Sequence, residues 1–435
     1  MWTGVHFGAT ATFCAGQPGE ARVDESNRRV LRGLAGRVRR LADRDRECEK
    51  RNLWYGHNAL QERYPVILCD PENGWNEIIT EDQLACTGTL ARRWEWVLRR
   101  QIFWGETLLD DRPVEPVFEI GTTHVDTGWG IDAEHRGGEG GTSYTWEPAI
   151  TAPSDIEKIR APKIALDHET TQETADLARS VLGDELEVRI RGLNVHSTHM
   201  TRDLAKMVGL ENMMVLMYDD PAFLHAIMKR FLAGHLERLD FLEANGLLTL
   251  NNDWSYVGSG GIGYCRELPR RRIGPGDRVR TEDLWLHDES QESVGVSPDM
   301  FAEIIYPYQA PVHARFGMNC YGCCEALESR WHVVKGIPNL RRVSVSAWAD
   351  ERKMAEFLGD RCVYSRKPNP TDLATPVLNE DAARLSIRTT LEVTRGGCIV
   401  ELVMKDNHTI GRNPQNVIRW VRIAREEIER LYGTP

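Results

Sequence analysis

Three cysteines, Cys320, Cys323 and Cys324, fall within five residues of the sequence and are followed at once by Glu325. Thiolates at the rigid end of a strand suit zinc, a borderline-soft metal that sulfur and nitrogen ligands bind. The alternative is that these cysteines are core residues, since cysteine is among the most often buried residue types. Three thiols this close together, beside Gly322 and a carboxylate, favour a functional site.

Cys323 is the central candidate ligand, with Cys320, Cys324 and His408 as candidate partners. Adjacent side chains on an extended backbone point to opposite sides, so Cys323 and Cys324 are not both expected to bind one ion without strain. Cys320 and Cys323, completed by His408 or Glu325, form a sterically possible set, and the sequence does not choose between the two. Zinc held in this way would bind a substrate thiol as its thiolate.

Helical segments and short apolar runs alternate along the chain, and this alternation predicts how these residues are positioned. A parallel sheet is expected, because parallel neighbours need a crossover connection, and eight strands favour a (β/α)8 barrel over an open doubly wound sheet. We expect an N-terminal helical extension over residues 1–60, loose up to about residue 25, and the barrel over 61–435. The expected strands are 65–69, 114–120, 186–190, 247–250, 312–318, 340–345, 361–364 and 398–403.

Two glycine-rich runs are read as loops. The run Gly258-Ser-Gly-Gly-Ile-Gly263 follows an expected strand but opens no helix, so it does not form a dinucleotide-binding turn. The segment Gly128–Gly141 is long enough for a loop that covers a site.

In a barrel the active site lies at the carboxyl ends of the strands, so the residues that follow each strand are candidates. Loops after strands are polar in any case, but the bias here toward His, Cys, Asp and Asn favours function. Glu325 and Asp406 are predicted to be ligands or proton carriers. The residues predicted to hold substrate are His196, Asn251, Asp253 and Arg366.

Composition excludes several classes of partner. The chain has 435 residues, 41% of them hydrophobic, and a formal net charge of −11. There is no Lys/Arg run interleaved with aromatics, so nucleic-acid binding is not expected, and no apolar stretch approaches 18 residues, so no membrane span is expected. The N-terminus lacks the pattern of a signal peptide, and ten scattered cysteines are typical of a reducing cytoplasm. We therefore expect a cytoplasmic protein.

The run Leu284-Trp-Leu-His-Asp-Glu through Ser297-Pro298 to Pro307-Tyr308, together with Cys398–Asn416, resembles the uroporphyrinogen decarboxylase superfamily. The likeness covers about residues 180–430 and implies a (β/α)8 barrel. The Arg-Gln-Ala-Gly-Arg signature of the decarboxylases is not found in the sequence. The corrinoid-linked methyltransferase branch has a His-x-Cys zinc motif, where this chain has Tyr321-Gly322-Cys323, and a later cysteine, which falls here near Met404-Lys405, close to His408.

The leading hypothesis is a zinc-dependent, methyltransferase-like enzyme. It would move a methyl group between a small-molecule donor or acceptor and a corrinoid or thiol, with the corrinoid on a separate carrier protein. One alternative is a metal-free decarboxylase or other lyase that binds substrate carboxylates through Arg191, Arg366 and Lys367. The other is a non-catalytic barrel that binds a ligand or senses redox state through its cysteines.

Overall fold

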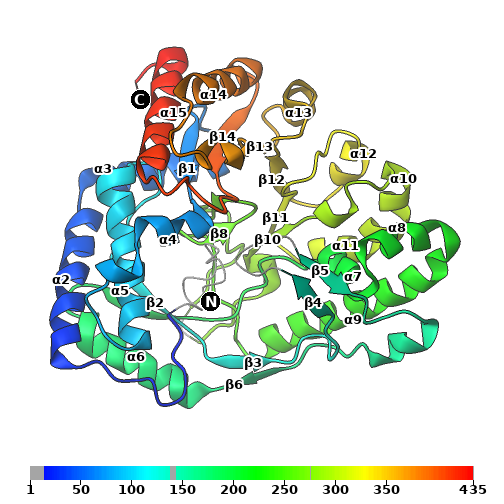
Figure 1. The fold of residues 1–435 in the computed structure, drawn as a ribbon, viewed down its shortest axis with the longest axis horizontal. Coiled ribbons are helices and arrows are strands. Elements are labelled where there is room, and N and C mark those ends of the chain that lie inside the picture. Colours follow the sequence, from blue (N-terminus) through cyan, green and yellow to red (C-terminus); the bar gives the residue numbers. More distant parts are fainter. Residues whose placement is uncertain (1–13, 138–143, 275, 435) are drawn as a thin grey trace.

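The computed structural model describes residues 14–137, 144–274 and 276–434 and shows a mixed α/β fold (Figure 1). Six strands form one parallel sheet in the order β1-β14-β13-β12-β11-β10, and β2 and β7 form a separate parallel pair. The parallel strands are β1 (Val66–Cys69), β2 (Val117–Gly121), β7 (Glu187–Arg191), β10 (Trp285–Asp288), β11 (Met318–Tyr321), β12 (Leu340–Val345), β13 (Val363–Arg366) and β14 (Ile399–Met404).

The first and last parallel strands are neighbours. Val66 of β1 pairs with Glu401 of β14, and Cys69 pairs with Met404. All residues of both strands are buried, as expected for parallel strands covered by helices on the outside. This pairing places the first and the last of the parallel strands side by side at one edge of the six-stranded sheet.

Helices surround the strands in Figure 1. The longest is α9 (Pro221–Ala244), which begins where the carboxylate of Asp220 accepts a hydrogen bond from the backbone N–H of Phe223. It ends before Gly246, because the φ of +64° at this glycine is not a helical conformation. The other helices are α2 (Glu25–Ala42), α3 (Asp45–Asn58), α4 (Trp75–Ile78), α5 (Thr89–Phe103), α6 (His168–Leu182), α7 (Met200–Val208), α8 (Leu210–Asp219), α10 (Pro298–Met300), α11 (Tyr306–His313), α12 (Trp331–Val334), α13 (Glu351–Leu358), α14 (Glu380–Thr394) and α15 (Gln415–Tyr432).

The prediction of an α/β fold with a parallel sheet is confirmed. Within the described ranges no strand ladder joins β1 to β2 or β7 to β10. The predicted strand 247–250 is wrong: this segment lies beside the end of β7, where Leu193 N–H donates to Leu247 O, but it forms no ladder. On its other side the amide of Asn251 bonds both backbone groups of Trp285, so a side chain takes the place of strand pairing.

The predicted strand 312–318 is also wrong. Helix α11 runs to His313, and the strand is β11, which begins at Met318. A short apolar run does not distinguish a buried strand from the end of a buried helix, and this explains the error. Strand β10 was not predicted from the sequence. Its apolar run is interrupted by His287 and Asp288, although both residues are buried.

Three antiparallel pairs complete the strands: β3 (His124–Asp126) with β6 (Ile164–Leu166), β4 (Glu134–Gly137) with β5 (Tyr144–Glu147), and β8 (Tyr256–Val257) with β9 (Gly261–Ile262). The expected loop 128–141 therefore contains β4, and its residues 138–141 lie outside the described residues. Residues 1–13 of the expected loose extension lie outside them too. The division at residue 60 stays a prediction.

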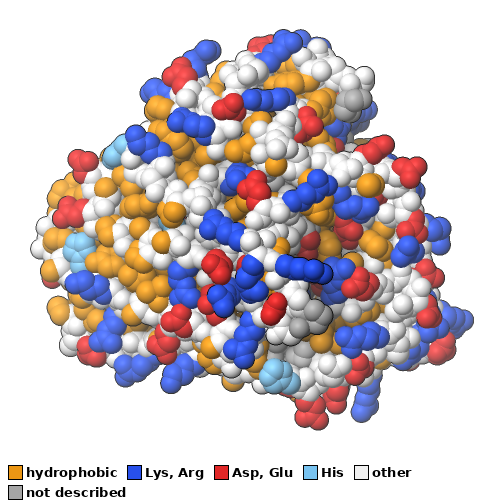
Figure 2. All heavy atoms as spheres, turned by 180° about the vertical axis from the view of Figure 1, so that it is seen from behind, with side chains coloured by type: hydrophobic (Ala, Val, Ile, Leu, Met, Phe, Trp, Pro, Cys, Tyr) orange, Lys and Arg blue, Asp and Glu red, His pale blue; other side chains and the backbone are white. Residues whose placement is uncertain are grey.

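Within the described residues no helix is both long enough and apolar enough to span a membrane. On the face opposite to that of Figure 1, acidic and basic side chains are intermixed (Figure 2).

A buried ion pair joins strands inside the six-stranded sheet. Arg342 Nε of β12 lies 2.9 Å from Glu401 Oε1 of β14, and both side chains are at most 1% exposed. The hydroxyl of Ser365, on the strand between them, also donates to Glu401, and His57 Nε2 lies 3.2 Å from Glu401 Oε2. Asn58 Oδ1 accepts from Arg342 Nη2 at 2.6 Å. The pair therefore ties β12, β13 and β14 to the end of α3.

We expect Arg342→Met to destabilise the protein by about 3–5 kcal/mol, because it leaves the Glu401 carboxylate buried without its main cation. The double variant Arg342→Met/Glu401→Leu should regain more than half of this loss, since no buried charge remains. Urea unfolding of the wild type, both single variants and the double variant measures the coupling. A single-variant loss below about 1 kcal/mol would contradict the role given to this pair.

Candidate active site

A cavity of about 600 Å³ opens where the parallel strands end. Its wall contains residues at or just beyond the ends of five strands, in chain order Gly121, Arg191, His287, Cys323 and Lys405. Because parallel strands direct their carboxyl ends to one side, residues far apart in the sequence share this space. A cavity of this size accommodates a small-molecule ligand.

Two thiols and a carboxylate meet on the cavity wall. Cys323 Sγ lies 3.7 Å from Cys324 Sγ, and Cys324 Sγ lies 3.7 Å from Asp406 Oδ2. One ligand atom from each of the three residues lies within 4.8 Å of the others. We call Cys323, Cys324 and Asp406 the thiol–carboxylate cluster.

The backbone around Gly322 explains why both thiols face the same way. Gly322 has φ +92°, and a Cβ at this position would lie 2.6 Å from Leu327 Cδ1, so both its conformation and its packing need glycine. The strand ends at Tyr321, and residues 323–325 form a bend. The expectation that the side chains of Cys323 and Cys324 diverge assumed an extended backbone, and it does not apply to a bend.

The two thiols differ in acidity. The pKa of Cys323 is lowered to about 7, first by a hydrogen bond from the Cys324 thiol and then by the nearby Lys405 ammonium, while burial acts in the opposite direction. The pKa of Cys324 is raised by the same hydrogen bond. Since the thiolate is both the nucleophile and the metal ligand, Cys323 is the more reactive member of the cluster.

Lys405 is a cation beside the thiol–carboxylate cluster. Its Nζ lies 3.1 Å from Asp406 Oδ1 and 3.4 Å from Glu72 Oε1, and its side chain is 6% exposed. Burial lowers the pKa of Lys405, but the nearby Tyr256 hydroxyl, then Glu72, the Cys323 thiol and Asp406, raise it more, so the pKa lies above its ordinary value and the amine stays charged.

Glu325 anchors the bend from behind and does not line the cavity. Its carboxylate accepts the backbone N–H groups of Ser290 and Cys323, each at 2.9 Å, and the residue is 1% exposed. Burial and then the charge of Glu289 raise the pKa of Glu325 to about 7. In this geometry Glu325 positions Cys323.

Three further candidate residues lie away from the cavity. Cys320 Sγ lies 3.7 Å from Arg342 Nη1 in the interior, and burial raises its pKa to about 11. His408 is exposed and outside the thiol–carboxylate cluster. Arg366 is buried against Glu351, with 2.7 Å between Nη2 and Oε1.

The remaining three candidates lie on or near the cavity. His196 lines it, with its ring centroid 5.1 Å from those of both Tyr256 and His287. Asn251 also lines it, but its amide is engaged by Trp285. Asp253 lies behind the wall, where its carboxylate accepts the N–H of Ser255 at 2.9 Å.

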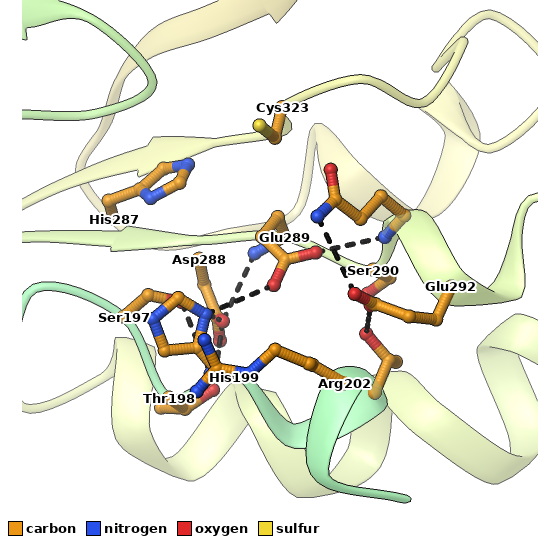
Figure 3. Close-up of polar contacts among 12 residues, drawn as sticks. Ser197, Thr198, His199, Arg202, His287, Asp288, Glu289, Ser290, Glu292 and Cys323 are labelled. Atoms are coloured by element: carbon orange, nitrogen blue, oxygen red, sulfur yellow. Dashed lines mark hydrogen bonds and ion pairs between the residues drawn. The ribbon is translucent and has the colours of Figure 1, made fainter. Parts of the chain in front are cut away.

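Sequence reasoning missed a polar cluster at the end of β10 (Figure 3). Asp288 accepts from the Thr198 hydroxyl at 2.8 Å, and its other oxygen lies 3.0 Å from His313 Nε2. Glu289 lines the cavity, with Oε1 lying 3.4 Å from His199 Nδ1. Burial and then Glu292 raise the pKa of Glu289, and burial lowers the pKa of His199.

Backbone conformation also marks this wall. His199 and Asp406 have φ of +51° and +61°, in the left-handed region that residues other than glycine rarely adopt, and such strain concentrates at functional sites. The signal that could have found Glu289 was the run Trp285–Glu289 itself, a short apolar segment that ends in three ionisable residues.

We expect Glu325→Gln to flatten the pH dependence of stability. The folded-state pKa of Glu325, about 7, exceeds the ordinary 4.5, so its contribution is present below pH 4.5 and is lost as the pH rises through 7. Between pH 5 and 8 the wild type should lose about 2–3 kcal/mol more than the variant. Urea unfolding in chelator at both pH values tests this, with exposed Glu303→Gln as the control. Equal losses in wild type and variant would contradict it.

No protein-family model matches the sequence, and no curated protein matches it. Among solved structures, a methyltransferase from Methanosarcina mazei matches with a TM-score of 0.47 at 11% sequence identity, over 87% of this chain and 97% of that chain. A match at this score assigns neither a family nor an activity to this chain.

Proposed function

We propose that this chain is a methyltransferase-like enzyme that holds zinc on the thiol–carboxylate cluster and moves a methyl group between a small molecule and a corrinoid or thiol acceptor. The observation that supports it is the meeting of two thiols and a carboxylate on the wall of a large cavity. We also propose that the eight parallel strands close into a (β/α)8-type barrel. Membership of the uroporphyrinogen decarboxylase superfamily, which the sequence resembles, stays a prediction.

The distances in the cluster fit zinc. Zn–S bonds of about 2.3 Å at a tetrahedral angle separate two sulfurs by about 3.8 Å, and a Zn–O bond of about 2.0 Å puts oxygen and sulfur about 3.5 Å apart. The corresponding separations here are 3.7 Å between the sulfurs and 3.7 Å between Cys324 Sγ and Asp406 Oδ2. Three protein ligands would leave the fourth position open to the cavity, as in catalytic zinc sites. Compared with the predicted ligand set, Asp406 replaces Cys320 and His408.

Bound zinc would supply Lewis acidity that keeps a substrate thiol ionised. The residues of the chain do the rest. The Lys405 ammonium would offset part of the negative charge that the Cys323 thiolate and Asp406 place on the wall. The imidazole of His199, kept neutral by burial, can accept the proton that a thiol loses, and Glu289 lies beside it. The sulfur would then attack the methyl carbon, and the bond from that carbon to the donor would break with its electron pair going to the donor.

The metal-free lyase has weaker support, because the cations it needs are engaged. Arg191 Nη2 lies 2.6 Å from Glu119, Arg366 lies against Glu351, and Lys367 Nζ donates to Ser365 O at 3.1 Å. The redox-sensing alternative would use the same two thiols. Turnover with a methyl donor would favour the enzyme over the redox sensor.

We expect about one zinc per chain in protein purified without chelator and a loss of this metal in Cys323→Ser. The matched control is Cys320→Ser, three residues away, which should keep its zinc because Cys320 Sγ is directed to Arg342. Asp406→Asn should weaken zinc binding by more than about 10-fold, because it removes an anionic ligand and the loss of even an outer hydrogen-bond partner typically costs about 10–100-fold. Plasma mass spectrometry measures the content. Equal zinc in Cys323→Ser and the wild type would contradict the proposed site.

Methyl transfer from methylcobalamin to a panel of small thiols tests the activity. We expect turnover in the wild type and in Cys320→Ser, with at least a hundredfold loss in Cys323→Ser, since that variant loses the ionised sulfur of the site. Turnover that survives in Cys323→Ser would place the chemistry elsewhere. Release of CO₂ from carboxylated substrates without metal would favour the lyase.

A further inference from the structure

The run Gly258–Gly263, predicted to be a loop, forms the turn and the second strand of the β8–β9 hairpin, which lies against the interior strands of the fold. A Cβ on Gly260 would lie 2.3 Å from Val403 Cγ1, and one on Gly261 would lie 2.4 Å from Arg342 Cζ. Gly258 has φ +74°, and a Cβ there would lie 3.1 Å from Arg342 Cδ and 3.2 Å from Cys320 Cβ. Side chains at positions 260 and 261 would collide with β14 and β12, and the backbone at 258 is left-handed, so these three positions favour glycine.

Because the hairpin lies so close to the strands, the hydroxyl of Ser259, the single hydroxyl of the run, contacts the candidate site. Ser259 is 4% exposed and lies on the cavity wall. Its Oγ donates to Cys323 Sγ at 3.2 Å and accepts from Lys405 Nζ at 3.4 Å. The three groups form a chain that runs from ammonium to hydroxyl to sulfur.

We propose that Ser259 is a positioning residue that orients Cys323 Sγ toward the cavity and couples it to the charge of Lys405. A hydroxyl that itself accepts from an ammonium is a stronger donor to an anionic sulfur, because each hydrogen bond polarises the next. Hydrogen bonds to a metal ligand commonly set its orientation and the affinity of the site. The inference deepens the proposed function and rests on it where metal affinity is concerned.

The chain offers a matched control for Ser259. Ser344 is also buried, at 3% exposure, and also contacts Cys323, but its Oγ donates to the backbone carbonyl at 2.9 Å and not to the sulfur. Ser259→Ala and Ser344→Ala therefore each remove one buried hydroxyl next to Cys323, and only the first removes a bond to Sγ.

The first arm of the experiment measures zinc affinity by competition with a chromophoric chelator. We expect Ser259→Ala to bind zinc about tenfold more weakly than the wild type and Ser344→Ala to stay within twofold. Cobalt(II) in place of zinc gives a spectroscopic signature: its sulfur-to-metal charge-transfer band should shift in Ser259→Ala alone, which a general loss of stability would not produce.

The second arm does not need a metal. In chelator-treated protein at pH 7.5, peptide mass spectrometry follows alkylation of Cys323 by iodoacetamide, with the exposed Cys48 as the internal reference. We expect the rate at Cys323 to fall at least threefold in Ser259→Ala and to stay unchanged in Ser344→Ala.

The two arms separate the inference from the proposed function. If the wild type holds no zinc, the proposed function fails and the alkylation arm alone decides on Ser259. If the wild type holds zinc but Ser259→Ala matches Ser344→Ala in affinity, band position and alkylation rate, the positioning role is overturned.

Discussion

The buried ion pair between Arg342 and Glu401 is the constraint on which the interior depends. Two charges with at most 1% exposure must be neutralised by each other and by hydrogen bonds, because an unpaired charge in such surroundings costs several kcal/mol. Ser365, His57 and Asn58 supply those bonds, so three strands and the end of α3 converge on one point. Replacing Arg342 or Glu401 alone would leave the opposite charge buried without its ion-pair partner.

The ion pair also determines what can fill the interior beside it. The backbone of Gly261 lies against the Arg342 guanidinium, and Ile262 O lies 3.4 Å from Arg342 Nη2. The hairpin is held there by contacts that exclude side chains, and Ser259 at its tip then has little freedom to move away from Cys323. The Arg342–Glu401 ion pair, the close packing of the hairpin glycines and the orientation of the candidate metal ligand Cys323 therefore depend on one another.

The site also depends on how the sheet brings the sequence together. Strands β11 and β14 are not neighbours, since β12 and β13 lie between them, yet the bend after β11 and the turn after β14 meet over the cavity. The left-handed backbone at Gly322 and Asp406 turns both loops inward. The thiol–carboxylate cluster is therefore assembled by two loops, which adjacent side chains on straight strands could not do.

Sequence by itself determined the α/β class, the parallel sheet, the strands around residues 66–69, 117–121, 340–345 and 399–404, and the thiol cluster, because alternating periodicity and residue types are local properties. It misplaced the strand before Cys320, since a buried apolar run has the same pattern in a helix and in a strand. It missed Glu289, since His287 and Asp288 interrupt the apolar run of the strand before it. It named Cys320, Cys324, His408 and Asp406 as candidate partners or ligands beside Cys323, and the structure brings only Cys324 and Asp406 of these to it. Which residues meet depends on backbone turns at Gly322 and Asp406 and on loops from distant strands, and these are decided only when the tertiary structure packs them together.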